Sequence, residues 1–214
     1  MNNISIRKIV IYLIGINILS IGTVLFSCAN LGVSALVSIP QILSLIFPIT
    51  LGQATTIFFI LLIIIEFILQ RKFQIQIILQ IVLAFVFGYI VDFYGVTLGL
   101  NSLNLPNLFD QFIIAFLAIV FTSIGIFIMV SVQFILIPPD GLVRIISELT
   151  KKQFGKVKFL FDLSTIVISI LISLIFIGHI EAIGIGTVAA VILVGHLINL
   201  WDNIKNWFCI NKSI

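Results

Sequence analysis

The sequence predicts an all-α membrane protein with six transmembrane helices. Apolar residues make up 61% of the 214 positions, charged residues only 9%, and the mean hydropathy is +1.35. No charged residue lies between Lys8 and Glu66. So much apolar surface needs lipid to cover it. Helices are expected because unpaired backbone groups are not tolerated in lipid, and the alternating pattern of a membrane barrel is absent.

A helix needs roughly 20 apolar residues to cross the hydrocarbon core. Charges, prolines and turn-forming residues divide the chain into six such stretches. We expect spans at about Ile9–Ser27, Thr50–Gln70, Phe73–Tyr94, Gln111–Leu136, Val157–Ile177 and Ile183–Trp201. The first span resembles a signal peptide, and Leu25–Cys28 looks like a lipoprotein cleavage box. Because more membrane-type sequence follows, an uncleaved first helix is the preferred interpretation.

Two stretches between the spans predict shorter helices. Residues 31–48 are apolar but interrupted by one glycine and two prolines, which predicts a re-entrant or surface helix at the outer face. Residues 140–152 predict a cytoplasmic amphipathic helix with Asp140 as its N-cap. Its apolar face would carry Leu142, Ile145, Ile146 and Leu149. A loop is expected at Gly95–Asn107, and an interfacial tail after Trp201.

The basic residues predict the orientation. With six crossings and a cytoplasmic N-terminus, all eleven fall on the cytoplasmic side, as the positive-inside rule requires, and the C-terminus lies there too. These residues are Arg7, Lys8, Arg71, Lys72, Arg144, Lys151, Lys152, Lys156, Lys158, Lys205 and Lys212. A full crossing at 31–48 would break this arrangement.

The chain reads as two similar halves, 1–108 and 109–214. Each has a long span, a short helix and two more spans. Three spans in each half give the halves opposite orientations, so we expect an inverted 3+3 repeat, an arrangement that is common in transporters. The matching stretches are Gly88–Tyr94 with Gly195–Trp201, Ser34–Val37 with Asp140–Val143, and Leu51–Gly52 with Phe154–Gly155.

Several motifs of the second half also carry a family resemblance. They are Pro139–Val143, Phe154–Lys156, Asp162, and Gly184–Thr187 with Gly195. The pattern resembles the YczE/YyaS/YitT family of bacterial inner-membrane proteins, most specifically from Pro138 to Gly195. The resemblance implies a six-span, multi-pass protein of the bacterial plasma membrane. It implies no substrate.

Asp162 is the strongest candidate for a binding role. Together with Thr165, Ser169 and Ser173 it forms one face of the fifth span, and this face should look into the helix bundle. An aspartate within the membrane costs roughly 2.5–3.5 kcal/mol on insertion scales, so it usually has a partner or a function. The alternative is a structural ion pair with Lys158, one turn earlier.

Further polar residues complete the candidate ligand-binding set. Asp140 is either an N-cap or a group at the inner mouth. Asp92 and Asn199 are equivalent positions of the two halves, and His196 precedes Asn199 by three residues. Thr187 lies at the start of the sixth span, just after Gly184 and Gly186. Close helix packing would explain these glycines, and so would an anion bound at the helix N-terminus.

Two other polar residues of the spans have structural explanations. Glu66 lies one turn from the inner end of the second span, where a side chain that extends to the interface is the simpler interpretation. Gln80 is a mid-span amide, which is more often a helix–helix contact than a ligand group.

The sequence does not predict an enzyme. The H-E-x-x-H, Walker A and G-x-S-x-G patterns are absent, and we expect no metal, cofactor or nucleic acid. Beyond the bilayer, the expected partners are a small polar or ionic solute, and a second copy or another membrane subunit. The favoured function is a small-solute transporter with a polar path between the repeats. The alternatives are a membrane scaffold in a larger complex and the substrate-binding subunit of an energy-coupling transporter.

Overall fold

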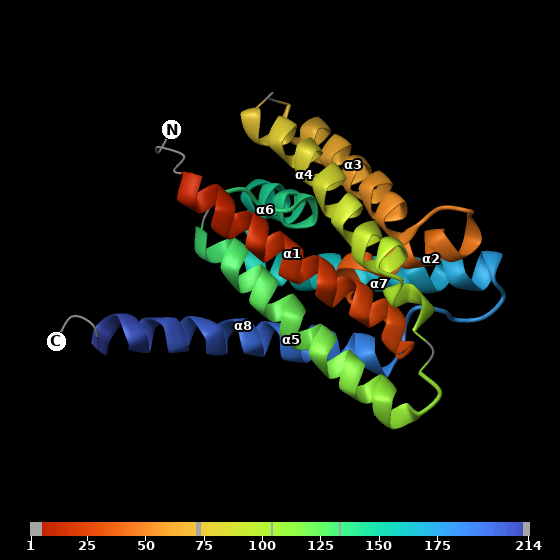
Figure 1. Cartoon of the computed structure of the whole chain (residues 1–214). Helices are drawn as coiled ribbons and strands as arrows, with labels where there is room; N and C mark the ends of the chain where they lie inside the picture. Colours follow the sequence, from red (N-terminus) through yellow and green to blue (C-terminus); the bar gives the residue numbers. More distant parts are fainter. Residues whose placement is uncertain (1–5, 72–73, 104, 133, 212–214) are drawn as a thin grey trace.

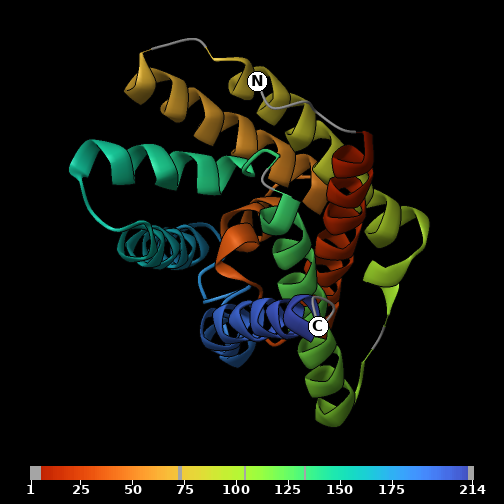
Figure 2. The same cartoon turned by 90° about the vertical axis from the view of Figure 1, so that its left-hand side faces the viewer.

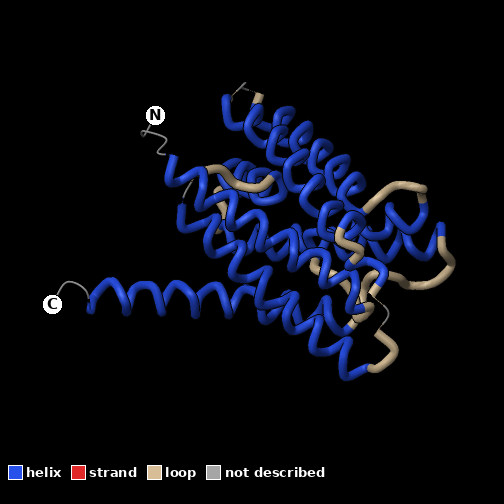
Figure 3. Tube along the Cα trace, in the orientation of Figure 1, coloured by secondary structure: helices blue, strands red, loops and turns tan. Residues whose placement is uncertain are grey.

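The computed structural model describes residues 6–71, 74–103, 105–132 and 134–211. Within these residues the chain is helical, with no strand (Figures 1 and 3). The α-helices are α1 (Ile6–Ala29), α2 (Ser38–Ile46), α3 (Leu51–Gln70), α4 (Ile75–Asp92), α5 (Leu108–Val132), α6 (Pro138–Thr150), α7 (Phe154–Phe176) and α8 (Ile185–Asn211). Short helical turns are η1 (Ala35–Val37), η2 (Phe93–Thr97) and η3 (Leu100–Ser102).

Among the described residues, five helices are long and apolar enough to cross a membrane, which indicates a multi-pass membrane protein. They are α1, α3, α4 with its extension η2, α5 and α7, and their bounds lie within a few residues of the predicted spans, apart from the end of α5. The apolar part of α8, Ile185–Trp201, is shorter. The predicted tail after Trp201 is instead a continuation of α8 to Asn211, and the predicted loop at Gly95–Asn107 contains helical turns.

The antiparallel helices α1 and α5 form the centre of the fold (Figures 1 and 2). Glycines let their backbones approach closely. A Cβ atom on Gly22 would lie 2.7 Å from the backbone nitrogen of Thr122, and one on Gly125 would lie 2.6 Å from that of Leu19. Small residues at helix contacts are how membrane helices gain packing energy in the absence of a hydrophobic drive.

The N-cap of the amphipathic helix α6 lies three residues before the predicted one. Its N-cap is Ile137 rather than Asp140, so the N-cap prediction is wrong. Pro138 favours the first helical position because proline has no N–H to satisfy there, and the Gly141 N–H closes the first turn onto the Ile137 carbonyl at 2.9 Å. Asp140 is therefore free to contact another helix. Leu142 and Ile145 are buried as predicted, whereas Leu149 is exposed.

The short helices connect the two halves of the chain. Helix α2 packs on α3 of its own half and on α7 of the other, and α6 packs on α7 and on α3 in the same way. Most of the buried apolar side chains gather where α1, α3, α4 and α6 meet, around Tyr12, Phe59 and Phe87. A second cluster surrounds Phe26 between α1, α5 and α8.

Candidate functional site

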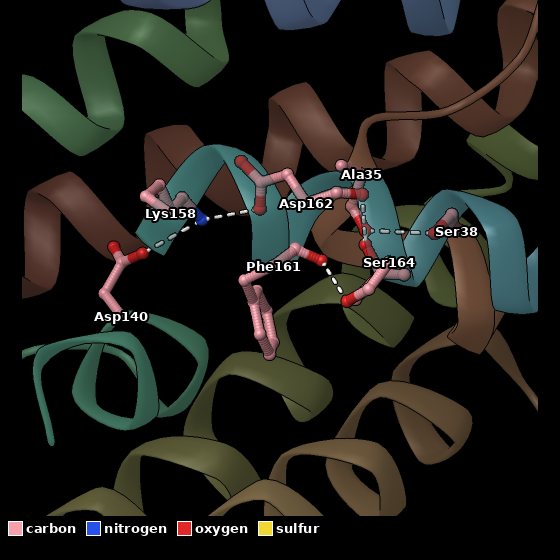
Figure 4. Close-up of polar contacts among 8 residues, drawn as sticks. Ala35, Ser38, Asp140, Lys158, Phe161, Asp162 and Ser164 are labelled. Carbon is pink, nitrogen blue, oxygen red and sulfur yellow. Dashed lines mark hydrogen bonds and ion pairs between the residues drawn. The ribbon is translucent and has the colours of Figure 1, made fainter. Parts of the chain in front are cut away.

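One lysine joins two of the predicted site residues. The ammonium of Lys158 on α7 lies 3.0 Å from the Asp140 carboxylate on α6 and 2.9 Å from the Asp162 carboxylate one turn along α7 (Figure 4). The Phe161 ring lies 5.9 Å from the same ammonium. The predicted structural pair of Lys158 and Asp162 is thus present, and Asp140 makes it a three-membered ion cluster that ties α6 to α7.

The polar face of α7 lies inside the protein, as predicted. Thr165, Ser169 and Ser173 are 4%, 0% and 0% exposed. Their hydroxyls donate to backbone carbonyls, those of Thr165 and Ser169 to residues one turn earlier and that of Ser173 to His179. Thr165 also contacts the Ala35 carbonyl of η1 at 3.2 Å. These hydroxyls hold α7 against the first half and the following loop.

Asp92 of α4 binds the N-terminus of α3. Its carboxylate accepts hydrogen bonds from the Thr50 hydroxyl at 2.5 Å and from the Gly52 N–H at 2.9 Å. An anion at a helix N-terminus is stabilised by the unpaired N–H groups there. A Cβ atom on Gly52 would lie 2.0 Å from the Gly88 carbonyl oxygen, so α3 and α4 touch at these glycines.

The remaining predicted site residues, Thr187, His196 and Asn199, lie on α8, away from the ion cluster of α6 and α7. Thr187 is 1% exposed and accepts a hydrogen bond from the Gly184 N–H at 3.3 Å, while Gly186 donates to the Leu31 carbonyl at 2.7 Å. Close packing therefore accounts for these glycines. His196 and Asn199 are exposed, and Nδ1 of His196 lies 2.7 Å from the Ile192 carbonyl oxygen one turn back.

A cavity of about 310 Å³ lies next to the ion cluster. Its walls come from α3 and α4 of the first half and from α5, α6 and the segment between them in the second half. The lining residues are Glu66, Gln76, Gln80, Met129, Val130, Phe134, Ile135, Leu136, Gly141, Arg144 and Ile145. A smaller adjoining space shares several of these walls and reaches Asp140. The larger cavity has the volume of roughly ten water molecules.

Two buried acceptor atoms face this cavity without a hydrogen-bond partner. Glu66 and Gln80 are 4% and 3% exposed, and their Oε2 and Oε1 atoms are unpartnered. Gly141 leaves the space that they occupy, because a Cβ there would stand 2.7 Å from Glu66 Oε2 and 2.2 Å from Gln80 Nε2. Other unpartnered polar atoms, such as those of Ser20 and Thr122, do not line the cavity.

Arg144 supplies a positive charge at the edge of the cavity. Its Nε donates to the exposed Glu148 carboxylate one turn along α6, at 2.9 Å. Arg144 also acts electrostatically on Glu66. The cavity therefore offers a carboxylate, an amide and a guanidinium, the groups that orient a small polar molecule in an otherwise apolar site.

Sequence reasoning did not identify Glu66, Gln80 and Arg144 as site residues. Glu66 carried a signal nonetheless, since it ends the long charge-free stretch that begins after Lys8. An ionisable residue inside a span is a functional candidate by default. The sequence does not show how α6 packs, and it is this packing that places Gly141 and Arg144 beside α3 and α4.

Comparisons with known proteins place the chain in a family. Residues 6–203 match the model of the family of unknown function DUF6198. The chain is 30% identical over 207 residues to the uncharacterized protein YyaS of Bacillus subtilis (strain 168), covering 96% of this chain and 98% of that protein. No solved structure matches it. This protein therefore belongs to the DUF6198 family and is similar to YyaS, in agreement with the family resemblance read from its motifs.

Proposed function

We propose that this protein is a plasma-membrane transporter of a small polar or ionic solute, and that the cavity beside Glu66 is its solute site. The observation that carries the proposal is the placement of unpartnered, buried acceptors in a cavity walled by both halves of the chain. A buried carboxylate is costly in a membrane protein and marks solute pathways. Transporters with inverted repeats bind solute where their repeats meet.

The helix contacts support a 3+3 inverted repeat. If α1 to α4 correspond to α5 to α8, the contacts of α2 with α3 and α7 correspond to those of α6 with α7 and α3. The contact of α1 with α4 likewise corresponds to that of α5 with α8. The halves differ in how their last two helices pack, because α3 and α4 pack closely against each other and α7 and α8 do not. Gly52 and Gly88 touch, whereas the equivalent Gly155 and Gly195 have no neighbour within 4 Å.

In the orientation we propose, the solute site faces the cytoplasm and both termini lie on that side. The start of α1, the end of α3 and the end of α8 lie on one side of the molecule, at the left of Figure 1. In a background without the two native cysteines, a single cysteine at Lys151 should react with an impermeant maleimide only in opened cells. A single cysteine at Asn107 should react in intact cells. Reaction of both cysteines in intact cells would contradict six crossings.

The function is tested by solute exchange in liposomes that contain the purified protein. Radiolabelled amines, guanidines, amino acids, sugars and carboxylates are offered outside, with the same unlabelled solute trapped inside. We expect one chemical class to accumulate faster than in protein-free liposomes, and Glu66→Gln to slow that exchange. If folded, reconstituted protein exchanges no solute of this panel, the transporter proposal is wrong and a non-transporting role in a larger complex is favoured.

A further inference from the structure

The buried hydrogen-bonding groups of the cavity that lack a partner are acceptors. Glu66 Oε2 and Gln80 Oε1 have no close hydrogen-bond partner. The amide group of Gln80, a donor beside them, lies 3.5 Å from the Leu136 carbonyl and also interacts with the Glu66 carboxylate. The nearby Ile135 carbonyl already accepts the Tyr12 hydroxyl at 2.9 Å. Buried polar atoms are nearly always paired in folded proteins. A ligand that completes this site must therefore bring donors.

The charge of the site favours a ligand that is positively charged as well as a donor. Glu66 is an acidic group whose side chain is almost fully buried, and Arg144, which acts on it electrostatically, is half exposed and bonded to Glu148. A ligand with a positive charge would neutralise the carboxylate and form charge-assisted hydrogen bonds, which are about twice as strong as neutral ones. The apolar walls, including Met129 and Ile145, suit a short hydrocarbon portion.

We infer that the cavity binds a small organic cation with N–H donors, such as a protonated amine or a guanidine. This inference rests on the proposed function, because it gives the chemical class of the solute at the same site. The carboxylate of Glu66 and the amide oxygen of Gln80 receive the N–H groups. Gly141 keeps the space between these two side chains and α6 open.

Binding is measured by equilibrium dialysis of the full-length protein in detergent against three labelled probes. Methylguanidinium has both charge and N–H donors, methylurea has a similar shape without the charge, and tetramethylammonium has the charge without donors. We expect methylguanidinium to bind saturably and at least about tenfold more tightly than either other probe. Glu66→Gln should weaken it by about tenfold or more, while Glu181→Gln, outside the cavity, should bind like the unmodified protein.

A second variant separates binding from folding. In Gly141→Ala the new Cβ would collide with the ends of the Gln80 and Glu66 side chains, which are flexible and can swing away. Alanine is also the better helix former, so the variant should melt no earlier than the unmodified protein. Methylguanidinium should nevertheless bind about tenfold or more weakly, because both acceptors have left their positions.

Three results overturn the cation inference: equal binding of methylurea and methylguanidinium, unchanged binding in Glu66→Gln, and no saturable binding of methylguanidinium up to about 10 mM. Exchange of a neutral or anionic solute that is lost in Glu66→Gln leaves the transporter proposal standing and overturns only the cation class. If methylguanidinium binds but no solute is exchanged, the cation-binding inference stands and the transporter proposal is wrong.

Discussion

Replacing Lys158 with methionine should lower the free energy of unfolding by about 2 kcal/mol, because it removes the shared cation of a partly buried ion cluster. The change keeps a long, unbranched side chain and removes its charge. Asp140 and Asp162 would then lose their shared cation. In the described part of the chain, the one ion pair that joins α6 to α7, Lys158–Asp140, would be lost. Unfolding in micelles with increasing SDS measures the difference.

The matched control is Lys152→Met, because Lys152 is exposed at the end of α6 and should contribute little. Asp162→Asn should cost less than Lys158→Met, since Lys158 keeps its contact with Asp140. An unchanged unfolding free energy in Lys158→Met would show that the cluster does not stabilise the fold. A large loss in Asp162→Asn with Lys158 still bound to Asp140 would equally contradict it.

Much of the helix pattern could be predicted because a membrane imposes simple rules on sequence. Long uncharged stretches give the spans, and breaks at prolines, glycines and charges give their ends. Asp140 has the sequence features of an N-cap, but the N-cap of α6 is Ile137, three residues earlier, and Pro138 is the first helical residue. Asp140 serves a distant contact with Lys158, which no local signal predicts.

The candidate site was predicted only in part, for a physical reason. The face of α7 from Asp162 to Ser173 follows from helical spacing, and its burial could be read from the sequence. The cavity depends instead on how α6 packs across α3 and α4, and such contacts between halves leave no periodic pattern. Glu66 seemed to reach the interface because it lies near a helix end. The structure buries it under Gly141.

A thiol introduced at Met129 should react with a small, charged methanethiosulfonate reagent although the residue is only 6% exposed. Met129 lines the cavity, where water and small solutes can enter. The thiolate attacks the reagent, forms a mixed disulfide and displaces methanesulfinate; this thiolate forms readily in water and poorly in apolar surroundings. Methylguanidinium should slow the reaction by occupying the same space.

The matched control is Ile119→Cys, on the same helix and 3% exposed, within the apolar cluster around Phe26. In a background without the native cysteines, the rates of modification of Met129→Cys and Ile119→Cys test the central claim most directly. If α5 borders a solute-accessible cavity, the thiol at 129 should react on the order of tenfold faster or more. Equally slow modification at both positions would mean that this space is closed to solutes, which would contradict a binding site beside Glu66.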